Sequence, residues 1–470
     1  MSALKSKLNA TLKSREDRRI LRKLPSPTSQ SAWIDFSSND YLSLSSSPAL
    51  RDHFLPKLSS APQILGSGGS RLLVNGLAHH ELEERLKVFF GVEAALLFNS
   101  GFDANVGLFE CVPQTGDVLI FDEYIHASVH DGMKRSRVSQ DSRFSFSHND
   151  LSSLHGLLEG LSKERPGLKK GLNTVFVAVE SLYSMDGTFA PLPEIVALLE
   201  KIFPKGNAFL IVDEAHATGI YGPQGKGLVA HFGLQGHDRV LARLCTFGKA
   251  LAGTGAVVLT HKLIRDYLIN YARPLIYTTS LSFANIVAVN CSFDFLENGR
   301  AQQLSSDLLS ISAYFLKHLT HRLSHTPPSL VALPCHLLAP SSPPSPSSPS
   351  PSPSATSTIT LVPPIIPLLT PHPHALASHL QNMDLNVRPI TWPTVPKGKE
   401  RVRICLHSGN GRDDIEKLVD GVVQWAGAWM KKEQQSTAKL GVGMPDDGVG
   451  NGLVSLAVPT ERLVLLESKL

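Results

Sequence analysis

The sequence predicts an α/β fold, with a large domain built on a doubly wound, mostly parallel sheet and a smaller α+β domain. Short apolar runs typical of buried strands occur at residues 94–98, 118–121, 174–180 and 209–213. Segments with apolar residues three or four positions apart lie between them, and this alternation favours parallel strands joined by helical crossovers. With 470 residues the chain exceeds the usual size of a single core, so two domains are expected.

The first part of the chain is expected to begin with a helix. Apolar residues recur at helical spacing within residues 4–24, and we expect this helix to lie across the body. A short strand follows at residues 33–36. The glycine-rich turn at residues 65–73 can let the backbone approach a ligand closely, and residues 79–90 have the pattern of an amphipathic helix.

The later elements and the domain boundaries follow from the same patterns. The later elements are expected in the order strand 255–259, helix 295–320, strand 358–369, helix 375–383, strand 401–406 and helix 412–430. The predicted division is residues 1–60 as an N-terminal helix and small-domain segment, 61–294 as the large domain, 295–432 as the small domain and 433–470 as a flexible tail.

Two segments stand outside this packed organisation. Residues 340–354 contain only proline and serine, so they cannot bury apolar surface and are expected to form a disordered surface insertion. The chain ends in Ser468-Lys469-Leu470 after a glycine-rich stretch, residues 441–452. That tripeptide matches a peroxisomal address, so we expect a peroxisomal import receptor as a partner and a peroxisomal location, with the cytoplasm as the alternative.

Composition excludes several classes of function. A net charge of +4 is too small to indicate nucleic-acid binding, and no apolar run approaches the ~20 residues that a membrane helix needs. The five cysteines have neither the spacing of metal ligands nor that of a disulfide framework. We therefore expect no nucleic acid, no membrane contact and no metal, in a reducing compartment.

The chemistry indicated by the sequence centres on Lys249. This lysine lies among small and apolar residues, where desolvation should lower the pKa of its amine and make it a usable nucleophile. The predicted strand at residues 209–213 ends in Asp213, and His216 follows three residues later. A lysine able to form an imine, together with a carboxylate able to pair with a pyridinium nitrogen, is what pyridoxal phosphate requires.

Six motifs make this pattern specific. They are SSNDYL at residues 37–42, GSGGSR at 66–71, NSGF at 99–102, SMDG at 184–187, DEAHATG at 213–219 and TFGK at 246–249. In the same order they resemble those of the α-oxoamine synthases, pyridoxal-phosphate enzymes of the fold-type I aminotransferase architecture. The resemblance runs from about residue 4 to residue 430, apart from the insertion.

The resemblance implies roles around the cofactor. Lys249 would form the imine and take the α-proton of the amino acid, Asp213 would pair with the ring nitrogen, and His216 would bind the phenolic oxygen. His126 would stack on the ring and contact substrate. The candidate contacts to the phosphate or the ring are Gly101, Phe102, Ser184 and Thr246. Thr278 would lie near the phosphate site of a partner subunit, which implies a homodimer.

The resemblance also implies substrate contacts. Arg403 would clamp the amino-acid carboxylate, since a guanidinium suits bidentate binding. Thr394 and Arg22 match substrate positions, and Arg22 is the candidate cation for a second carboxylate on the acyl chain. Arg401 is expected to point to the opposite face of the strand into solvent. Residues 406–410 (LHSGN) depart from the Ala-Ala-His pattern common in the family.

The reaction that the resemblance implies is decarboxylative condensation of an amino acid, expected to be alanine, with an acyl-CoA, expected to be pimeloyl-CoA, as in biotin synthesis. Glycine C-acetyltransferase, 5-aminolevulinate synthase, serine palmitoyltransferase and polyketide-releasing enzymes use the same chemistry and remain alternatives. A non-catalytic scaffold subunit is the alternative from another class, and the presence of Lys249, Asp213 and His216 together argues against it.

Overall fold

The computed structural model describes residues 2–18, 20–24, 33–338 and 361–440, with the backbone alone at 436–440. The predicted insertion at 340–354, the start of the strand predicted at 358–369, and the C-terminal tripeptide lie outside these residues. Two compact units are distinguished, residues 1–426 and 427–470. The finer division of the first unit at residues 60 and 294 stays a prediction.

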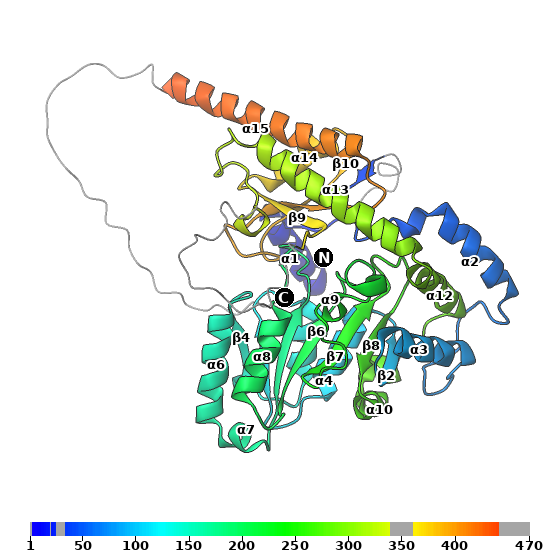
Figure 1. Cartoon of the computed structure of the whole chain (residues 1–470). Coiled ribbons are helices and arrows are strands. Elements are labelled where there is room, and N and C mark those ends of the chain that lie inside the picture. The colour runs from blue at the N-terminus through cyan, green and yellow to red at the C-terminus, as the bar shows by residue number, and fades with distance from the viewer. Residues whose placement is uncertain (1, 19, 25–32, 339–360, 441–470) are drawn as a thin grey trace, which may run out of the picture. The chain divides into compact units, whose positions relative to one another are not determined.

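The centre of the first unit is a seven-stranded sheet with helices on both sides (Figure 1). Its strands, in spatial order, are β2 (Ala94–Phe98), β8 (Ala256–Thr260), β7 (Val240–Thr246), β6 (Ala208–Asp213), β5 (Val175–Glu180), β3 (Val118–Asp122) and β4 (Arg143–Phe146). The strands from β7 to β4 run parallel, whereas β8 is antiparallel to both of its neighbours. The predicted mostly parallel, doubly wound sheet is thereby confirmed.

Apolar strands explain why this sheet is central. Every residue of β2, β5 and β8 is buried, as a sheet covered by helices on both faces requires. The helices of this region are α3 (Leu77–Phe90), α4 (Gly101–Cys111), α5 (Ala127–Arg135), α6 (Leu151–Glu164), α7 (Pro166–Lys170), α8 (Leu192–Ile202), α9 (Leu228–His231), α10 (Lys262–Tyr271) and α11 (Arg273–Ile276). Helix α4 packs against α5, and α6 against α8.

Two smaller sheets join distant parts of the chain. The strand β1 (Ile34–Asp35) runs parallel to β10 (Leu385–Asn386). Strands β11 (Arg388–Ile390), β12 (Arg401–Cys405) and β9 (Ile365–Leu369) form an antiparallel sheet, on which α14 (Pro373–Gln381) packs. An N-terminal strand therefore pairs with a strand some 350 residues later, as the register of Ile34 opposite Leu385 shows.

Several helices differ from their predicted bounds. The helix predicted at 295–320 is two helices, α12 (Phe283–Glu297) and α13 (Arg300–Arg322), because Gly299 between them has a left-handed φ of +82°. The last helix, α15 (Arg412–Leu440), continues beyond residue 430. A further helix, α2 (Pro48–Ser60), precedes the glycine-rich turn.

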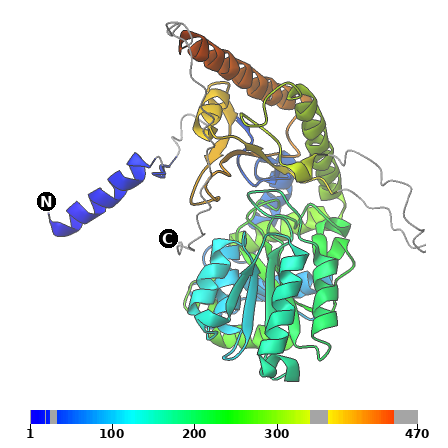
Figure 2. The same ribbon diagram turned by 90° about the vertical axis from the view of Figure 1, so that its left-hand side faces the viewer.

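The N-terminal helix differs most. It spans Ala3–Asp17 rather than 4–24 (the blue helix at the N-terminus in Figure 2). Its leucines Leu4, Leu8 and Leu12 are exposed. The expectation that this helix lies across the body stays a prediction. Among the described residues, no helix has the length and apolar character needed to cross a membrane.

Candidate active site

The predicted site residues gather where the parallel strands end. β5 ends at Glu180, β6 at Asp213 and β7 at Thr246, and α4 begins at Gly101. Ligands of open α/β sheets bind at the carboxyl ends of the strands, where loops and helix N-termini meet. The fold thus brings segments separated by more than a hundred residues to one edge of the sheet.

Lys249 is held against a histidine. Its Nζ lies 2.8 Å from the Nε2 of His216, whose Nδ1 lies 2.6 Å from the hydroxyl of Tyr41. Burial lowers the pKa of Lys249 to about 8, although the carboxylate of Asp213 acts in the opposite direction. Burial and the nearby Lys249 amine hold the pKa of His216 well below its usual range, so this imidazole is neutral at physiological pH.

Asp213 is fixed by the side-chain amide of Asn105, a residue that was not identified from the sequence. Asn105, on α4, donates through Nδ2 to the Oδ2 of Asp213 (2.8 Å) and to the Oγ of Ser128 (3.0 Å). The backbone amide of Ala215 donates to the other Asp213 oxygen at 2.9 Å. The carboxylate, 8% exposed, is therefore oriented from two sides.

His126 joins the same chain of contacts. Its Nδ1 accepts the Ser128 amide at 3.3 Å and lies 2.7 Å from the Ser128 hydroxyl, so the proton of the neutral ring sits on Nε2. The ring remains exposed and meets Phe102 edge-on, with 6.5 Å between ring centres. Desolvation by the surrounding walls lowers the pKa of His126, although Asp213 opposes the effect.

The start of α4 is suited to bind a phosphate. The first amides of a helix have no acceptor within it, and here they belong to Gly101 and Phe102 after the cap residue Ser100. A methyl group added at Gly101 would lie 3.6 Å from the Oγ1 of Thr246, so this hydroxyl is beside the helix start. Thr278 is nearby, because its Oγ1 accepts from Asn99 at 3.4 Å.

Arg403 and Arg401 lie on the same strand, β12, and contact different residues. Arg403, 8% exposed, donates through Nε to the carbonyl oxygen of Ser184 (2.6 Å) and through Nη2 to the Oδ1 of Asn39 (2.9 Å). Arg401 was expected in solvent, but it is 2% exposed and pairs with Asp186. That expectation is wrong because residues two apart on a strand share a face, so Arg401 meets Met185 and Asp186 on the side where Arg403 meets Ser184.

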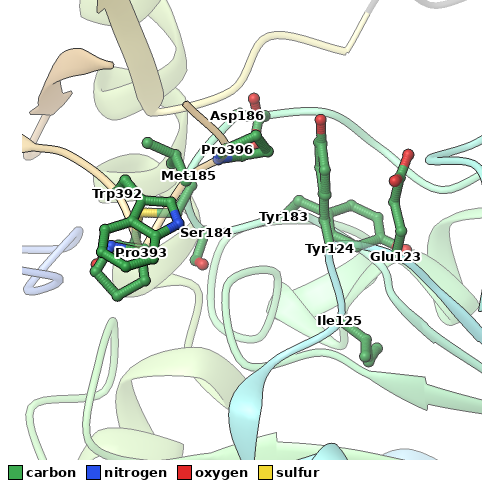
Figure 3. A pocket seen from close by; sticks show the side chains of 12 residues that line it. Glu123, Tyr124, Ile125, Tyr183, Ser184, Met185, Asp186, Trp392, Pro393 and Pro396 are labelled. Atoms are coloured by element: carbon green, nitrogen blue, oxygen red, sulfur yellow. The ribbon is translucent and has the colours of Figure 1, made fainter. Parts of the chain in front are cut away.

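A cavity of about 310 Å³ opens beside these arginines (Figure 3). It contains Ser184 and Thr394, two of the predicted residues, on walls formed by residues 123–125, 183–186 and 392–396. Asp186, the partner of Arg401, lies on the same wall as Ser184. Ser184, which lines the cavity, accepts the hydrogen bond from Arg403 through its backbone carbonyl oxygen.

Arg22 is the predicted residue that the structure does not bring to the others. Its side chain is exposed, and among the described residues no contact joins it to the cavity or to Lys249. Four residues earlier, Arg18 lies over the ring of Trp392, 5.9 Å from the ring centre. Trp392 lines the cavity, so in this segment Arg18, rather than Arg22, contacts a residue of the cavity wall.

Glu180 is a buried carboxyl that sequence reasoning missed. It lies opposite Asp213 in the register of β5 and β6, and its Oε1 has no hydrogen-bond partner among the described residues. Burial, followed by the charge of Asp213, raises the pKa of Glu180 well above its usual range. The signal that could have found it is its place at the end of a predicted buried strand.

These residues fit pyridoxal phosphate. An amine with a pKa near 8 suits imine formation, and a carboxylate fixed by Asn105 suits a pyridinium nitrogen. The first amides of α4 and the Thr246 hydroxyl suit a phosphate. Lys249, Asp213 and the start of α4 are the groups that would hold the cofactor.

A second cluster, away from this site, has the residue types of a metal site. His53, Cys291 and Asp294 place their ligand atoms within 4.8 Å of one another. The carboxylate of Asp294 is already paired with Lys57 and Arg85, so it has cations for partners without a metal.

Comparison with known proteins agrees with this arrangement. The family model described as aminotransferase class I and II matches residues 31–422. The chain is 42% identical to the 8-amino-7-oxononanoate synthase of Emericella nidulans, over 93% of this chain and 98% of that protein. It is 35% identical to the aminoacyl transferase sphA of Aspergillus fumigatus, over 86% of this chain and 84% of that protein.

Solved structures show the same fold. The 8-amino-7-oxononanoate synthase of Francisella tularensis is 25% identical, with a TM-score of 0.62, and the match covers 86% of this chain and 99% of that one. A serine palmitoyltransferase from S. paucimobilis with bound PLP–myriocin aldimine is 23% identical, with a TM-score of 0.70, over 91% of this chain and 99% of that one. The predicted fold, family resemblance and cofactor are confirmed.

Proposed function

The chain belongs to the aminotransferase class I and II family, as a pyridoxal-phosphate-dependent acyltransferase of the α-oxoamine synthase kind, and we propose that its substrates are L-alanine and pimeloyl-CoA. The products would be 8-amino-7-oxononanoate, CoA and CO2, which is a step of biotin synthesis. The observation that carries this choice of substrates is the 42% identity, over almost all of both chains, to an 8-amino-7-oxononanoate synthase.

Lys249 and Asp213 have different roles in this condensation. Pyridoxal phosphate, when bound, withdraws electrons and so stabilises negative charge on the α-carbon of the amino acid. Lys249, with a pKa near 8, can accept the α-proton once its amine is free. Asp213, whose carboxylate is fixed by Asn105 and by the Ala215 amide, would hold a proton on the ring nitrogen of the bound cofactor.

Arg403 is proposed to bind the carboxylate of the amino acid. Its guanidinium is pre-oriented by Ser184 and Asn39 through Nε and Nη2, and Nη1 takes no part in these two bonds. A charge-assisted contact to a carboxylate is among the stronger hydrogen bonds and fixes orientation. The α-carbon, after losing its proton to Lys249, then forms a bond with the acyl carbon as the thioester C–S bond breaks and CoA leaves as its thiolate. The carboxylate leaves as CO2, and the electron pair that remains on the α-carbon takes up a proton, for which protonated Lys249 is the proposed donor.

The acyl chain is proposed to lie in the cavity that contains Thr394. The ring of Trp392 on its wall has Arg18 at 5.9 Å and Lys397 at 5.5 Å from the ring centre, so cations are present at this wall. For the distal carboxylate of pimeloyl-CoA we propose Arg22. Arg22→Ala should raise KM for pimeloyl-CoA more than for an uncharged acyl-CoA. An Arg18→Ala variant that alone shows this discrimination would instead assign the contact to Arg18.

A second candidate is condensation of another amino acid with another acyl-CoA, as favoured by the 35% identity to aminoacyl transferase sphA. A panel of amino acids and acyl-CoAs with the purified holoenzyme decides between them. Selective turnover of alanine with pimeloyl-CoA supports the first proposal. Selective turnover of serine, or of a long uncharged acyl-CoA, would replace it.

We also propose that the enzyme is a homodimer in which Thr278 lies near the phosphate site of the partner subunit. The apolar side chains of Leu72, Leu73 and Tyr277 are exposed, and this is compatible with a surface that a partner subunit covers. Sedimentation analysis should give twice the chain mass of 50.9 kDa. A monomer with full activity would contradict the proposal.

Peroxisomal import through a receptor for Ser468-Lys469-Leu470 is proposed on the sequence of that tripeptide. An enzyme that uses a dicarboxylic acyl-CoA gains from a compartment that shortens fatty acids. Deleting the tripeptide should leave the purified enzyme active but make cells require biotin or a precursor. Biotin-free growth of the truncated strain at normal expression would contradict the argument from location.

A further inference from the structure

One loop holds the segment that delivers Asn39 and Tyr41 to the site. Following β12, the backbone amide of Ser408 donates to the carbonyl oxygen of Tyr41 at 2.8 Å. The amide of Gly409 donates to the Oγ of Ser43 at 3.0 Å. Residues 406–410 therefore form a direct contact with residues 35–43, which are distant in the sequence. This is also the loop whose sequence departs from the family pattern.

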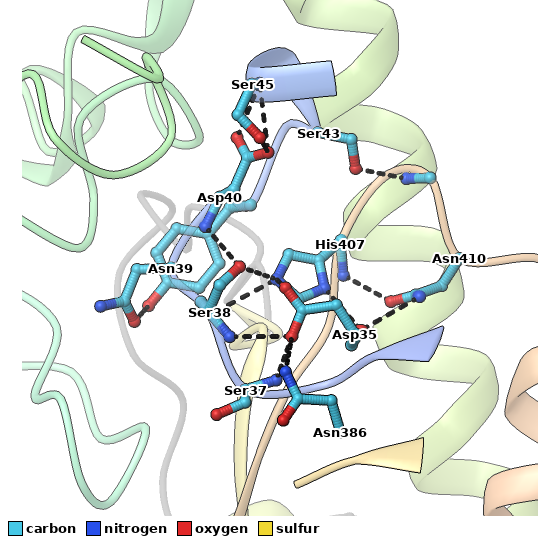
Figure 4. A network of polar contacts seen from close by, with 12 residues as sticks. Asp35, Ser37, Ser38, Asn39, Asp40, Ser43, Ser45, Asn386, His407 and Asn410 are labelled. Carbon is cyan, nitrogen blue, oxygen red and sulfur yellow. Dashed lines mark hydrogen bonds and ion pairs between the residues drawn. The ribbon is translucent and has the colours of Figure 1, made fainter. Parts of the chain in front are cut away.

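His407 is at the centre of this contact (Figure 4). The side chain is 4% exposed, and its Nδ1 lies 3.0 Å from the carbonyl oxygen of Asp35. A carbonyl oxygen only accepts, so Nδ1 donates to it in the tautomer that carries the ring proton on Nδ1. The Nε2 lies 3.1 Å from the hydroxyl and 3.2 Å from the carbonyl oxygen of Ser38. Asn410 supports the ring, since its Oδ1 accepts the His407 amide at 2.8 Å.

The segment held in this way contacts the reacting groups at two points. The Oδ1 of Asn39 accepts from Arg403 at 2.9 Å. The hydroxyl of Tyr41 lies 2.6 Å from the Nδ1 of His216, whose other nitrogen meets Lys249. Ser38, held by His407, is the residue immediately before Asn39. A shift of this short segment would therefore change the surroundings of both Arg403 and Lys249.

We propose that His407 is a positioning residue for the reaction: its two ring nitrogens fix residues 35–43, so that Asn39 orients Arg403 and Tyr41 orients His216. In its effect on amino-acid binding, the inference rests on the role proposed for Arg403. Buried polar groups with both ends bonded restrict a segment to one arrangement, and errors of about 1 Å in catalytic geometry can cost ~100-fold in rate. His407 does not touch substrate, so its effect has to pass through Asn39 and Tyr41.

The test compares His407→Asn with His374→Asn. The Nδ2 of asparagine can replace the Nδ1 contact to Asp35 but cannot reach Ser38. His374 is an exposed histidine of α14 and serves as the matched control. In the cofactor-free protein, amide hydrogen exchange should be faster in residues 33–43 of His407→Asn, with the seven-stranded sheet unchanged. This readout does not depend on the identity of either substrate.

In the loaded enzyme, His407→Asn should raise KM for the amino acid about tenfold, worth ~1.4 kcal/mol, and leave KM for the acyl-CoA within about twofold. The pH midpoint of the imine absorbance should also move. Ser38→Ala removes the hydroxyl contact and keeps the carbonyl contact, so it should reproduce part of these changes, and the double variant should add little to His407→Asn. If His407→Asn does not fold, the same hydrogen-exchange and KM measurements are made on Ser38→Ala.

Two results would overturn the proposal. One is unchanged exchange in residues 33–43 together with an unchanged amino-acid KM. The other is a uniform increase of exchange throughout the sheet, which would make His407 a residue of general stability. A further outcome is that the substrates prove to be others than those proposed. If hydrogen exchange in residues 33–43 and the pH midpoint of the imine absorbance still change in that case, the positioning role of His407 stands and only the proposed substrates are wrong.

Discussion

The Nζ of Lys249 and the Nε2 of His216 are 2.8 Å apart, and neither group has to be charged at pH 8. Burial lowers the pKa of both side chains, that of Lys249 to about 8. A protonated amine beside a neutral imidazole can donate to it, and a neutral amine can attack an aldehyde. The pair therefore permits both protonation states of the lysine within the physiological range.

The first prediction concerns the pH dependence of cofactor capture by the cofactor-free protein. Only the neutral amine attacks the aldehyde of pyridoxal phosphate, and a lysine with a lowered pKa loses its proton as the pH rises through about 8. The capture rate, followed by absorbance, should therefore increase with pH and level off above about 8. A rate that keeps rising to the ordinary lysine pKa of ~10.4 would contradict the lowered value.

The imine itself is tested by Lys249→Ala. This variant should bind pyridoxal phosphate reversibly, because Asp213 and the start of α4 remain, but it should lose turnover. Borohydride reduction should leave the cofactor on the wild-type chain and not on the variant, as mass spectrometry of the intact protein would report. Covalent cofactor on the variant after reduction would assign the imine to another lysine.

The electronic role of Asp213 is tested by Asp213→Asn. The amide leaves the shape of the site nearly intact but does not hold a proton on the ring nitrogen, so stabilisation of negative charge on the substrate weakens. We expect kcat to fall more than about tenfold, equivalent to ~1.4 kcal/mol of barrier. Asn105→Ala should give a smaller fall, because the Ala215 amide still orients Asp213. A fall in kcat of less than tenfold in Asp213→Asn would contradict the contact assigned between Asp213 and the ring nitrogen.

How much the sequence alone could predict depends on the range of the interaction. The strand that ends at Asp213 and the position of Lys249 among small residues are local patterns, and both predicted their structural environment correctly. Asn105 is linked to Asp213 and to Ser128 through contacts between α4 and other elements that no local spacing encodes. Arg401 was misplaced for a different reason: residues two apart on a strand share a face, so Arg401 points with Arg403 toward residues 184–186.

The proline–serine insertion lies outside the described residues and remains a prediction. Excising residues 340–354 should leave kcat, KM and the melting temperature nearly unchanged, because proline and serine alone cannot bury apolar surface. The excised and full-length proteins can be compared by calorimetry and by steady-state kinetics. A large loss of melting temperature would show that the segment packs against the folded protein.

Arg401 and Arg403 lie two residues apart on one strand, and opposite outcomes are expected from their replacement. Arg401→Met leaves the carboxylate of Asp186 without its cation. Breaking a fully buried pair costs ~3 kcal/mol or more, and the 19% exposure of Asp186 lowers the expected cost to ~1–2 kcal/mol. The free energy of unfolding should fall by about that amount, as denaturant titration would measure, while the amino-acid KM changes little. Arg403→Lys keeps the charge but loses the planar fork, so it should raise the amino-acid KM about tenfold or more with a smaller loss of stability.

The double variant Arg401→Met with Asp186→Asn separates charge from packing in this prediction. Since both members of the pair are removed, no carboxylate is left unpaired, and most of the lost stability should return. If the double variant is as unstable as Arg401→Met, the arginine acts through its bonds to backbone carbonyls, such as that of Met185, and not through Asp186. If Arg401→Met instead raises the amino-acid KM as strongly as Arg403→Lys, the assignment of the carboxylate to Arg403 alone is wrong.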